Sequence, residues 1–488
     1  MTAGWRDRAG VLPALLLAAA IAIRAIDFGN PVIHVDEQYY LLVGQRMLDG
    51  AVPYLDLWDR KPWGLFALYA AAAAIPGDDI LGYQLLATLF AAATAWIVAS
   101  GARTLGASRG GALAAGVAYL LWLSLLGGRG GQAPVFYNLL IALAARLTLR
   151  LPSLSPRAIV ANGLAACLLG GLAIQLKPVA AVEAAFLGAA HLWYLARTSD
   201  RRRAIAAAPL WIAVGLLPTL AVMAGYRALG ADALGAWWFA NVTSILLRPG
   251  YPPGELAMRL LGIAAELSPL LLCAAIGWRR RNVRMVRERQ LAFGWLAAAL
   301  VGFFSIGTFF DHYALPLLVP LATIAGIALG RIPRVMVGTL VLGALLAIVE
   351  RAVVPADAAG ARAVAAVVRA NSAGGCPYVF IGDTITYSLA DACVPTPYAF
   401  PNFIAYTTEQ ASTGIDEAAE LRRILAGRPP VIVASTRSLR IWNPATLPVI
   451  RQALARDYRP IFSVPRSGWR TVVFLRRDRA LSRSAPRS

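Results

Sequence analysis

The sequence has few charged residues. Only 15% of its 488 residues are Asp, Glu, Lys or Arg, whereas 58% are apolar. A soluble chain carries about 25% charged residues, so this composition excludes an ordinary soluble globular protein. Apolar runs near the roughly 20 residues needed to cross a bilayer recur along the chain, for example at 11–26, 81–99, 204–224, 291–308 and 335–349. We therefore expect a polytopic integral membrane protein.

The net charge of +20 suggests a nucleic-acid binder until the charges are placed along the chain. Most arginines lie in short loops between apolar runs, and the alternate loops are poor in them. The arginine-rich loops hold Arg103 and Arg109, Arg150 and Arg157, 197–203, 279–289, and Arg331 and Arg334. Cytoplasmic loops of membrane proteins carry such an excess. The pattern places the N-terminus, with Arg6 and Arg8, in the cytoplasm and argues against a nucleic-acid partner.

About eleven α-helical spans are expected from the apolar periodicity. They lie near 11–27, 81–101, 111–126, 134–150, 158–174, 178–196, 204–225, 257–276, 291–308, 314–330 and 334–350. An odd number of spans places the C-terminus outside. The segments 28–80 and 226–254 then form outside loops, and residues 1–350, including the first loop, form a transmembrane domain.

The tail, residues 351–488, has a different composition. Short apolar runs at 378–381, 431–434 and 471–475 alternate with helix-like stretches at 361–370, 416–426 and 447–456. This alternation predicts a small soluble α/β domain on the extracytoplasmic side.

Cysteine is scarce, and no Cys/His spacing matches a zinc site. Cys167 and Cys273 fall in apolar spans and are expected to be packing residues. Cys376 and Cys393 lie in the tail, which we place in an oxidising compartment. If the apolar runs that start near them are neighbouring parallel strands, about 4.8 Å apart, a disulfide can join the two cysteines. We predict that bridge; the alternative is two independent buried thiols.

Acidic residues are rare in the chain but concentrated in the first outside loop. Of 26 Asp and Glu residues, five lie between residues 34 and 70: Asp36, Glu37, Asp49, Asp56 and Asp59. Adjacent carboxylates at a membrane surface repel one another and lose hydration. A site that takes a proton from an acceptor, or holds a divalent ion, gives a reason for this cost. The alternative for Asp36 is a cap of the short helix expected up to Leu48.

Lysine is almost absent. Of the 46 Lys and Arg residues, only Lys61 and Lys177 are lysines. Both precede a proline, and both map to the outer membrane boundary. A compact ammonium suits a single phosphate oxygen, where the planar guanidinium of arginine fits less well. The alternative is a lysine whose charge snorkels at the end of a span.

The first loop resembles the first-loop signature of GT-C-type membrane glycosyltransferases that use polyprenyl-phosphate sugars. The nearest branch is the bacterial one related to protein O-mannosyltransferases and lipid A aminoarabinose transferases. The matching residues are Asp36-Glu37, Pro53-Tyr54, Asp56, Trp58-Asp59 and Lys61-Pro62, and later Phe310-Asp311-His312-Tyr313 followed by Leu315-Pro316. The resemblance covers roughly residues 1–350 and is strongest over 34–69; the tail matches only in placement.

The resemblance implies a GT-C-like fold and roles for individual residues. Asp36 would be the catalytic base on the acceptor, and Glu37 would assist or help to hold a divalent metal ion. Lys61 would face the donor phosphate. Relatives often carry a second acidic residue in the next outside loop, but here that loop contains Arg129 and Gln132. Because Gln132 cannot act as a base, the case for a metal is weaker.

Further candidates complete the expected site. Arg129 and Lys177 could bind the donor phosphate, or could be a charged loop tip and a snorkelling lysine. The expected substrate-binding residues are His34, Tyr54, Asp56, Trp58, Asp59, Gln132, His312 and Tyr313. For His312 and Tyr313 the alternative is a place in the interfacial aromatic belt.

The resemblance thus implies an inverting hexosyl- or pentosyltransferase of the inner (plasma) membrane. It would move a sugar from a polyprenyl-phosphate donor to an envelope glycolipid, glycan or protein on the periplasmic face, among membrane lipids. The main rival function is a transporter or flippase of a lipid-linked or anionic substrate, for which Glu183 and Glu266 in or near spans are the best evidence. Two more functions stay open, a polysaccharide polymerase or ligase and a non-catalytic membrane scaffold.

Overall fold

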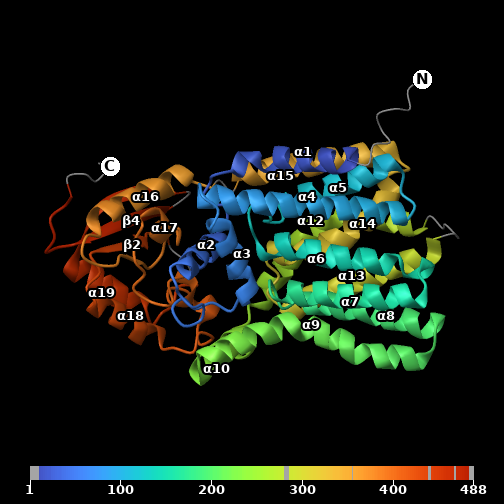
Figure 1. Cartoon of the computed structure of the whole chain (residues 1–488). Coiled ribbons are helices and arrows are strands. Elements are labelled where there is room, and N and C mark those ends of the chain that lie inside the picture. The colour runs from blue at the N-terminus through green and yellow to red at the C-terminus, as the bar shows by residue number, and fades with distance from the viewer. Residues whose placement is uncertain (1–9, 280–284, 354–355, 438–440, 467–468, 483–488) are drawn as a thin grey trace. The chain divides into compact units, whose positions relative to one another are not determined.

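The computed structural model of the chain describes residues 10–279, 285–353, 356–437, 441–466 and 469–482 (Figure 1). Arg6 and Arg8, which support the predicted orientation of the N-terminus, lie outside these residues. The chain divides into two compact units, each assembled from three separate stretches. Unit 1 comprises Met1–Phe28, Tyr83–Ala224 and Tyr251–Val354, and unit 2 comprises Gly29–Gly82, Gly225–Gly250 and Pro355–Ser488. The first outside loop is thus grouped with the tail rather than with the spans.

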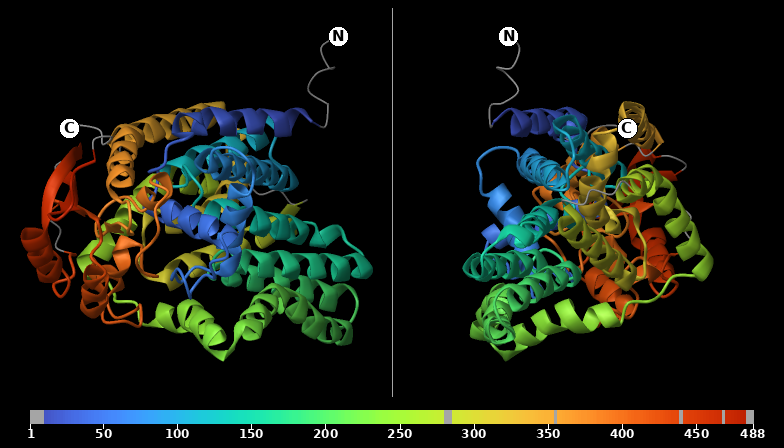
Figure 2. Two further views of the ribbon diagram at one scale, coloured as in Figure 1. Left: turned by 60° about the vertical axis from the view of Figure 1, so that its left-hand side comes forward. Right: turned by 90° about the vertical axis from the view of Figure 1, so that its right-hand side faces the viewer.

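Unit 1 is built mainly of long helices that run alternately in opposite directions (Figures 1 and 2). Its helices are α1 (Val11–Arg24), α4 (Asp79–Thr104), α5 (Arg109–Leu125), α6 (Ala133–Leu149), α7 (Pro156–Ile174), α8 (Ala180–Thr198), α9 (Arg201–Leu229), α12 (Pro253–Arg279), α13 (Val286–Ile306), α14 (Leu318–Leu329) and α15 (Pro333–Val353). Short helices η1 (Ala25–Asp27), η2 (Leu151–Ser153), η5 (Asp311–Tyr313) and η6 (Leu315–Leu317) lie in the connections.

Several of these helices are suited to a bilayer. Within the described part of the chain, 7 helices are long and apolar enough to cross a membrane: α4, α6, α7, α9, α12, α13 and the segment that begins with α15. Each predicted span coincides with a helix of unit 1. The prediction of a multi-pass membrane protein is therefore confirmed, whereas the count of about eleven spans stays a prediction.

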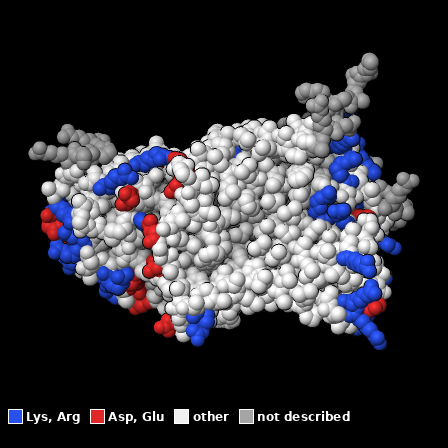
Figure 3. All heavy atoms as spheres, viewed as in Figure 1, with Lys and Arg blue, Asp and Glu red and all other residues white. Residues whose placement is uncertain are grey.

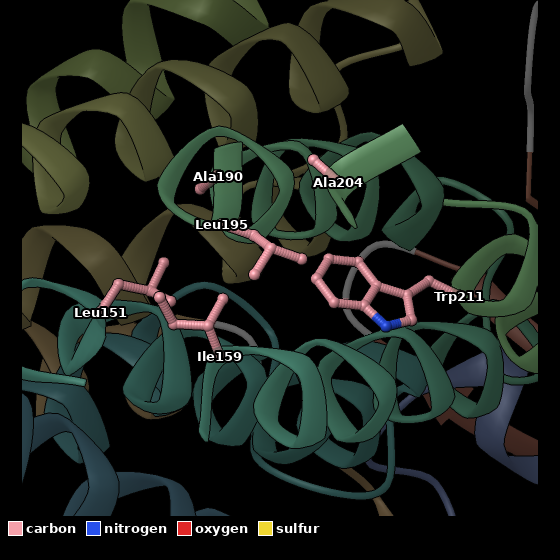
Figure 4. Close-up of a cluster of buried hydrophobic side chains, with 6 residues drawn as sticks. All are labelled: Leu151, Ile159, Ala190, Leu195, Ala204 and Trp211. Atoms are coloured by element: carbon pink, nitrogen blue, oxygen red, sulfur yellow. The ribbon is translucent and has the colours of Figure 1, made fainter. Parts of the chain in front are cut away.

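Small residues allow the helices of unit 1 to approach closely. Gly111 of α5 faces the backbone of Gly326 and Gly330 in and just after α14, where an added Cβ atom would collide. Gly163 of α7 lies against the indole ring of Trp211 in α9. Trp211 belongs to a buried apolar cluster with Leu151, Ile159, Ala190, Leu195 and Ala204 (Figure 4). Close packing of this kind holds membrane helices together, because lipid provides no hydrophobic drive between them.

Charge is unevenly distributed over unit 1. Exposed arginines gather at one end of its helices, next to a broad uncharged face (Figure 3). They are Arg103, Arg109, Arg150, Arg157, Arg197, Arg201, Arg202, Arg203, Arg279, Arg287, Arg331 and Arg334. All lie in or beside alternate connections, as a membrane protein with arginine-rich loops on one side requires.

Unit 2 combines the first outside loop, the second outside loop and the tail. Its helices are α2 (Val35–Leu48), α3 (Trp63–Ala73), α10 (Ala231–Trp238), the π-helix η3 (Phe239–Thr243), α11 (Ser244–Leu246), α16 (Ala358–Asn371), α17 (Thr386–Leu389), η7 (Pro401–Phe403), η8 (Thr407–Glu409), α18 (Glu417–Ala426) and α19 (Leu447–Asp457). Its strands are β1 (Tyr378–Val379), β2 (Val431–Ser435), β3 (Tyr458–Arg466) and β4 (Trp469–Arg476).

The four strands form one sheet in the order β1-β2-β4-β3. Strands β1 and β2 are parallel, and the other two pairings are antiparallel. The predicted α/β tail is confirmed, with each predicted helix and apolar run at or near an observed element. Strand β3 was not predicted. It contains Pro460 and Pro465 and lies at the sheet edge, where a strand tolerates proline because no second neighbour needs its N–H groups.

A disulfide joins Cys376 and Cys393, with 5.0 Å between the two Cα atoms. The predicted bridge is confirmed, but the predicted reason for it was wrong. Residues 393–400 form no strand, and β1 pairs instead with β2, more than fifty residues later in the chain. The cysteines meet because the short helix α17 reverses the chain between them.

Candidate functional site

Helix α2 carries the adjacent carboxylates Asp36 and Glu37 in its first turn. The helix cap is His34, whose Nδ1 accepts a hydrogen bond from the Asp36 amide at 3.2 Å. His34, and not Asp36, is therefore the cap of α2. Asp36 is half-buried, whereas Glu37 is fully buried with 0% of its surface exposed. Of the two, Asp36 is the one that an acceptor could approach.

Helix α2 is held against α3 by a close backbone approach. An added Cβ atom on Gly44 would lie 2.7 Å from the backbone nitrogen of Ala70. The buried rings of Tyr40 and Tyr69 pack edge to face beside this contact, 5.6 Å apart. Helix α2, which carries the two carboxylates in its first turn, is thus packed closely against α3.

Tyr54 organises the turn that follows α2. Its backbone adopts a φ of 70°, a left-handed conformation that costs energy for a residue with a side chain. Its amide donates to the Leu57 carbonyl at 2.7 Å, and its hydroxyl donates to the Lys61 carbonyl at 2.8 Å. The turn that presents Asp59 and Lys61 is therefore built around a single buried tyrosine.

Asp59 interacts electrostatically with Asp36 of α2 and with Lys61. Burial raises the pKa of Asp59, the charges of Lys61 and Arg60 oppose this rise, and the nearby carboxylate of Asp36 adds to it. The Lys61 ammonium lies over the Tyr40 ring, 5.2 Å from its centroid. Unit 2 thus brings two carboxylates and one ammonium together, as the first-loop motif predicts.

Other first-loop residues have structural contacts. Trp58 is only 3% exposed, packs edge to face on Phe403 at 4.8 Å, and donates its amide to the Pro397 carbonyl. Asp56 is exposed and accepts a hydrogen bond from the Val52 amide at 2.7 Å. The geometry gives Trp58 a packing role and Asp56 a turn-forming role.

In unit 1, the predicted residues of two connections lie side by side. The Lys177 ammonium, between α7 and α8, lies 4.2 Å from the centroid of the Tyr313 ring in η5. His312 packs edge to face on Tyr313, with 4.5 Å between the ring centroids. A Cβ atom on Gly127 would approach the Cβ of His312 at 3.7 Å, so the loop after α5 joins the same group.

Arg259, near the start of α12, was not predicted from the sequence. Its guanidinium lies between the rings of Tyr251 and Phe310, 4.2 and 4.1 Å from their centroids. It also donates to the Thr308 carbonyl and pairs with Glu255. Phe310 in turn stacks on His312, so Arg259 extends the cationic and aromatic group of unit 1. One arginine among many carried no distinguishing pattern in the sequence.

Arg129 lies in a buried charge network instead of at a loop tip. It is 6% exposed and faces Glu350 at 3.4 Å and Asp27 at 4.0 Å. Asp27 also pairs with Arg351 at 2.8 Å, and Arg24 donates to the carbonyls of Gly128 and Gly130 at 2.6 Å. Gln132, which follows Arg129 in the same loop and precedes α6, is 1% exposed. The contacts of Arg129 thus fit a role in fixing the Gly-rich loop.

No group of three or more His, Cys, Asp or Glu side chains gathers as a metal site within the described residues. Asp36 and Glu37 are adjacent in sequence, but only Asp36 is open to solvent. These two residues alone do not match the ligand set of a dedicated divalent-metal site.

No family model and no curated protein matches the sequence. The structure is similar to crystal structures of ArnT from Cupriavidus metallidurans. For ArnT bound to undecaprenyl phosphate, the TM-score is 0.67 at 15% identity, with 96% of this chain and 98% of that chain covered. For apo ArnT, the TM-score is 0.66 at 15% identity, with coverages of 94% and 97%. An oligosaccharyltransferase from Archaeoglobus fulgidus, solved as a complex with Zn and sulfate, gives a TM-score of 0.49 at 11% identity, with 86% and 67% covered. The similarity to ArnT confirms the predicted GT-C-like fold.

Proposed function

We propose that this chain is a glycosyltransferase that transfers a sugar from a polyprenyl-phosphate donor to an envelope glycolipid, glycan or protein. The observation that carries the proposal is the group of Asp36, Asp59 and Lys61 in unit 2. In this proposal the half-buried carboxylate of Asp36 supplies a base, and the ammonium of Lys61 supplies positive charge for a phosphate leaving group; both interact electrostatically with Asp59. The fold similarity to ArnT, whose structure holds undecaprenyl phosphate, supports the same donor class.

In the proposed reaction, Asp36 accepts a proton from the acceptor hydroxyl or amine. The freed lone pair forms a bond to the anomeric carbon, and the bond from that carbon to the phosphate oxygen breaks. The bonding electrons leave with polyprenyl phosphate, whose negative charge Lys61 stabilises. Attack opposite the leaving group inverts the anomeric carbon. This reaction balances without a nucleotide sugar or a metal.

Unit 1 offers a second set of groups suited to an anionic lipid headgroup. Lys177 and Arg259 each lie over aromatic rings in connections at one end of the helices. We assign them, with His312 and Tyr313, to binding of the donor phosphate or sugar. Both cations pack against aromatic rings, and Arg259 also pairs with Glu255. Arg129 fits this role less well, because it is buried and faces two carboxylates, Asp27 and Glu350.

We further infer that the site faces the periplasm of an inner (plasma) membrane, with the N-terminus in the cytoplasm. This inference is supported by the exposed arginines, which lie at one end of the helices of unit 1. The positive-inside rule assigns that end to the cytoplasm. Single cysteines placed at Asp56 and at Arg331 should react with an impermeant thiol reagent from opposite sides. Labelling of both from the same side would overturn this topology.

The transporter alternative depends on carboxylates within the helices. Glu183 is buried and accepts a hydrogen bond from the Trp295 indole at 2.7 Å, which joins α8 to α13. This contact gives Glu183 a packing role, so it adds nothing specific to the transporter alternative.

The test compares cells that carry the wild-type chain, Asp36→Asn or no gene. Asp36→Asn keeps the shape of the side chain but removes its basicity, and the loss of a general base lowers turnover by about 10²–10⁴-fold. Mass spectrometry of envelope glycans should show the same missing sugar, and the same accumulated lipid-linked sugar, in the variant and in the deletion. The matched control is Asp49→Asn at the other end of α2, where the carboxylate is exposed. Normal sugar transfer by membrane-inserted Asp36→Asn would refute the role of Asp36.

A further inference from the structure

A buried ion cluster lies next to the turn that carries Asp59 and Lys61. Arg60, between them in sequence, points its guanidinium at three acceptors. It pairs with Glu409 and donates to the hydroxyls of Ser412 at 2.8 Å and Ser244 at 3.2 Å. Its side chain is 10% exposed and that of Glu409 is 8% exposed. The planar fork of arginine allows one side chain to satisfy all three acceptors.

Glu409 joins three stretches of chain that are far apart in sequence. Its Oε2 accepts from Arg60 of the first loop, and its Oε1 accepts from Arg248 of the second loop at 2.9 Å. The backbone carbonyl of Glu409 also accepts from the Ser412 hydroxyl at 2.7 Å. A single carboxylate in the tail therefore neutralises one arginine from each outside loop.

The contacts around Arg60 constrain the backbone on both of its sides. The guanidinium of Arg60 lies 5.6 Å from the centroid of the Trp58 ring, and the Trp58 amide donates to the Pro397 carbonyl at 2.9 Å. On the other side, the Lys61 carbonyl accepts the Tyr54 hydroxyl. Because Arg60 immediately precedes Lys61, contacts that fix Arg60 also restrain the backbone that carries Lys61.

We propose that Glu409 is a positioning residue: by holding Arg60, it sets where Lys61 presents its ammonium to the donor. The proposal rests on the transferase function given above. Both carboxylate oxygens of Glu409 accept from arginines, so the role assigned to Glu409 is positioning and not contact with the reacting groups. The tail thus contributes to the site through the geometry of the first loop, without supplying a reacting group.

The first measurement is independent of activity. In the purified full-length protein, hydrogen exchange at the Trp58 amide should be faster in Glu409→Gln than in wild type, because the variant loses the charge that holds Arg60. The matched control is Asp478→Asn, since Asp478 also bridges two arginines, Arg428 and Arg476, but is 47% exposed. Unchanged exchange in Glu409→Gln would overturn the proposal.

The second measurement separates positioning from general stability. Glu409→Gln should lower kcat/KM for a polyprenyl-phosphate sugar by about 10- to 100-fold, the scale of a misplacement near 1 Å. In a Lys61→Ala background the same substitution should change kcat/KM by less than about threefold, because the group being positioned is absent. Equal losses in both backgrounds would show a merely structural role and overturn the proposal.

Ser412→Ala covers the case in which Glu409→Gln fails to fold. It removes one neutral acceptor of Arg60 and leaves the ion pair in place. It should lower kcat/KM less than Glu409→Gln, and again only when Lys61 is present. If the wild-type protein transfers no sugar from any lipid-linked donor, the transferase function fails, while hydrogen exchange still decides whether Glu409 holds the turn.

Discussion

Removal of the Cys376–Cys393 bridge should loosen unit 2 around β1. The two cysteines are 17 residues apart, and closing a loop of this length stabilises a fold by about 3 kcal/mol in the chain-entropy model. A free-energy change of about 1.4 kcal/mol corresponds to a factor of ten in an equilibrium constant. Without the bridge, the equilibrium constant for local unfolding of the segment between Cys376 and Cys393, here called the closed segment, should therefore rise by roughly 100-fold. A double substitution to serine avoids a leftover thiol.

The closed segment contacts the helix that carries the proposed base, so the effect should reach beyond the bridge. The Ile385 amide donates to the side chain of Gln38 at 3.2 Å, and Arg46 donates to the Ala392 carbonyl at 2.6 Å. The assay is native-state hydrogen exchange at Phe380, whose amide donates to the Val433 carbonyl at 3.0 Å. The double serine variant should exchange there roughly 100-fold faster than wild type.

Cys167→Ala is the matched control, because Cys167 is a free, half-buried cysteine in unit 1. It should leave exchange at Phe380 unchanged. Non-reducing peptide mapping of the wild-type protein comes first, and free thiols at Cys376 and Cys393 would refute the bridge itself. With the bridge present, unchanged exchange in the double variant would refute the reasoning from loop closure.

Three further predictions concern the first loop. Lys61→Ala should raise the KM for the donor by about 10- to 100-fold, which corresponds to the loss of one charge-assisted hydrogen bond. Lys61→Arg should restore little of the lost donor affinity, and an arginine variant with the wild-type KM would contradict this prediction. Burial raises the pKa of Asp59 above its ordinary value of 3.8, so folding is favoured most below that value and loses stability as pH rises through the raised pKa. The melting temperature of Asp59→Asn relative to wild type should therefore be higher near about pH 7 than near about pH 4, and a constant difference would argue against a buried ionising carboxylate. Gly44→Ala should lower the free energy of unfolding by about 1–3 kcal/mol, because the added Cβ atom would lie 2.7 Å from the backbone nitrogen of Ala70. Gly235→Ala is the control, because a Cβ atom there meets open space and should not destabilise the protein. Equal effects of the two substitutions would refute the close-approach argument.

The membrane character and the α/β tail could be predicted because both depend on local patterns. Span positions follow from apolar runs, and the strands β2 and β4 follow from short apolar runs between helix-like stretches. Strand β3 was not predicted, because its prolines and exposed residues suit an edge strand, in which the alternation of apolar and polar residues is weak. The bridge between Cys376 and Cys393 was predicted from an incorrect strand pairing, since β1 finds its partner far along the chain.

The site could be predicted only as far as its chemistry is local. Asp36, Asp59 and Lys61 stood out because rare residue types cluster in one loop. The partners of Arg129 could not be predicted, because Asp27 and Glu350 lie about 100 and 220 residues away along the chain. Burial of Glu37 and the helix cap at His34 likewise depend on the packed structure, which no single-sequence pattern encodes.

The three-part composition of unit 2 constrains when this protein can mature during synthesis. About 270 residues separate the first loop from the start of the tail. At about 5–20 residues per second, a ribosome needs roughly 15–55 seconds to make them. Throughout this interval Arg60 has been synthesised but Glu409 has not. The surfaces of the first loop that the tail covers in the folded protein are therefore exposed during this time. A chaperone on the side of the membrane that receives this loop would cover these surfaces in the meantime, and a tail fragment expressed alone would lack the arginines that pair with Glu409.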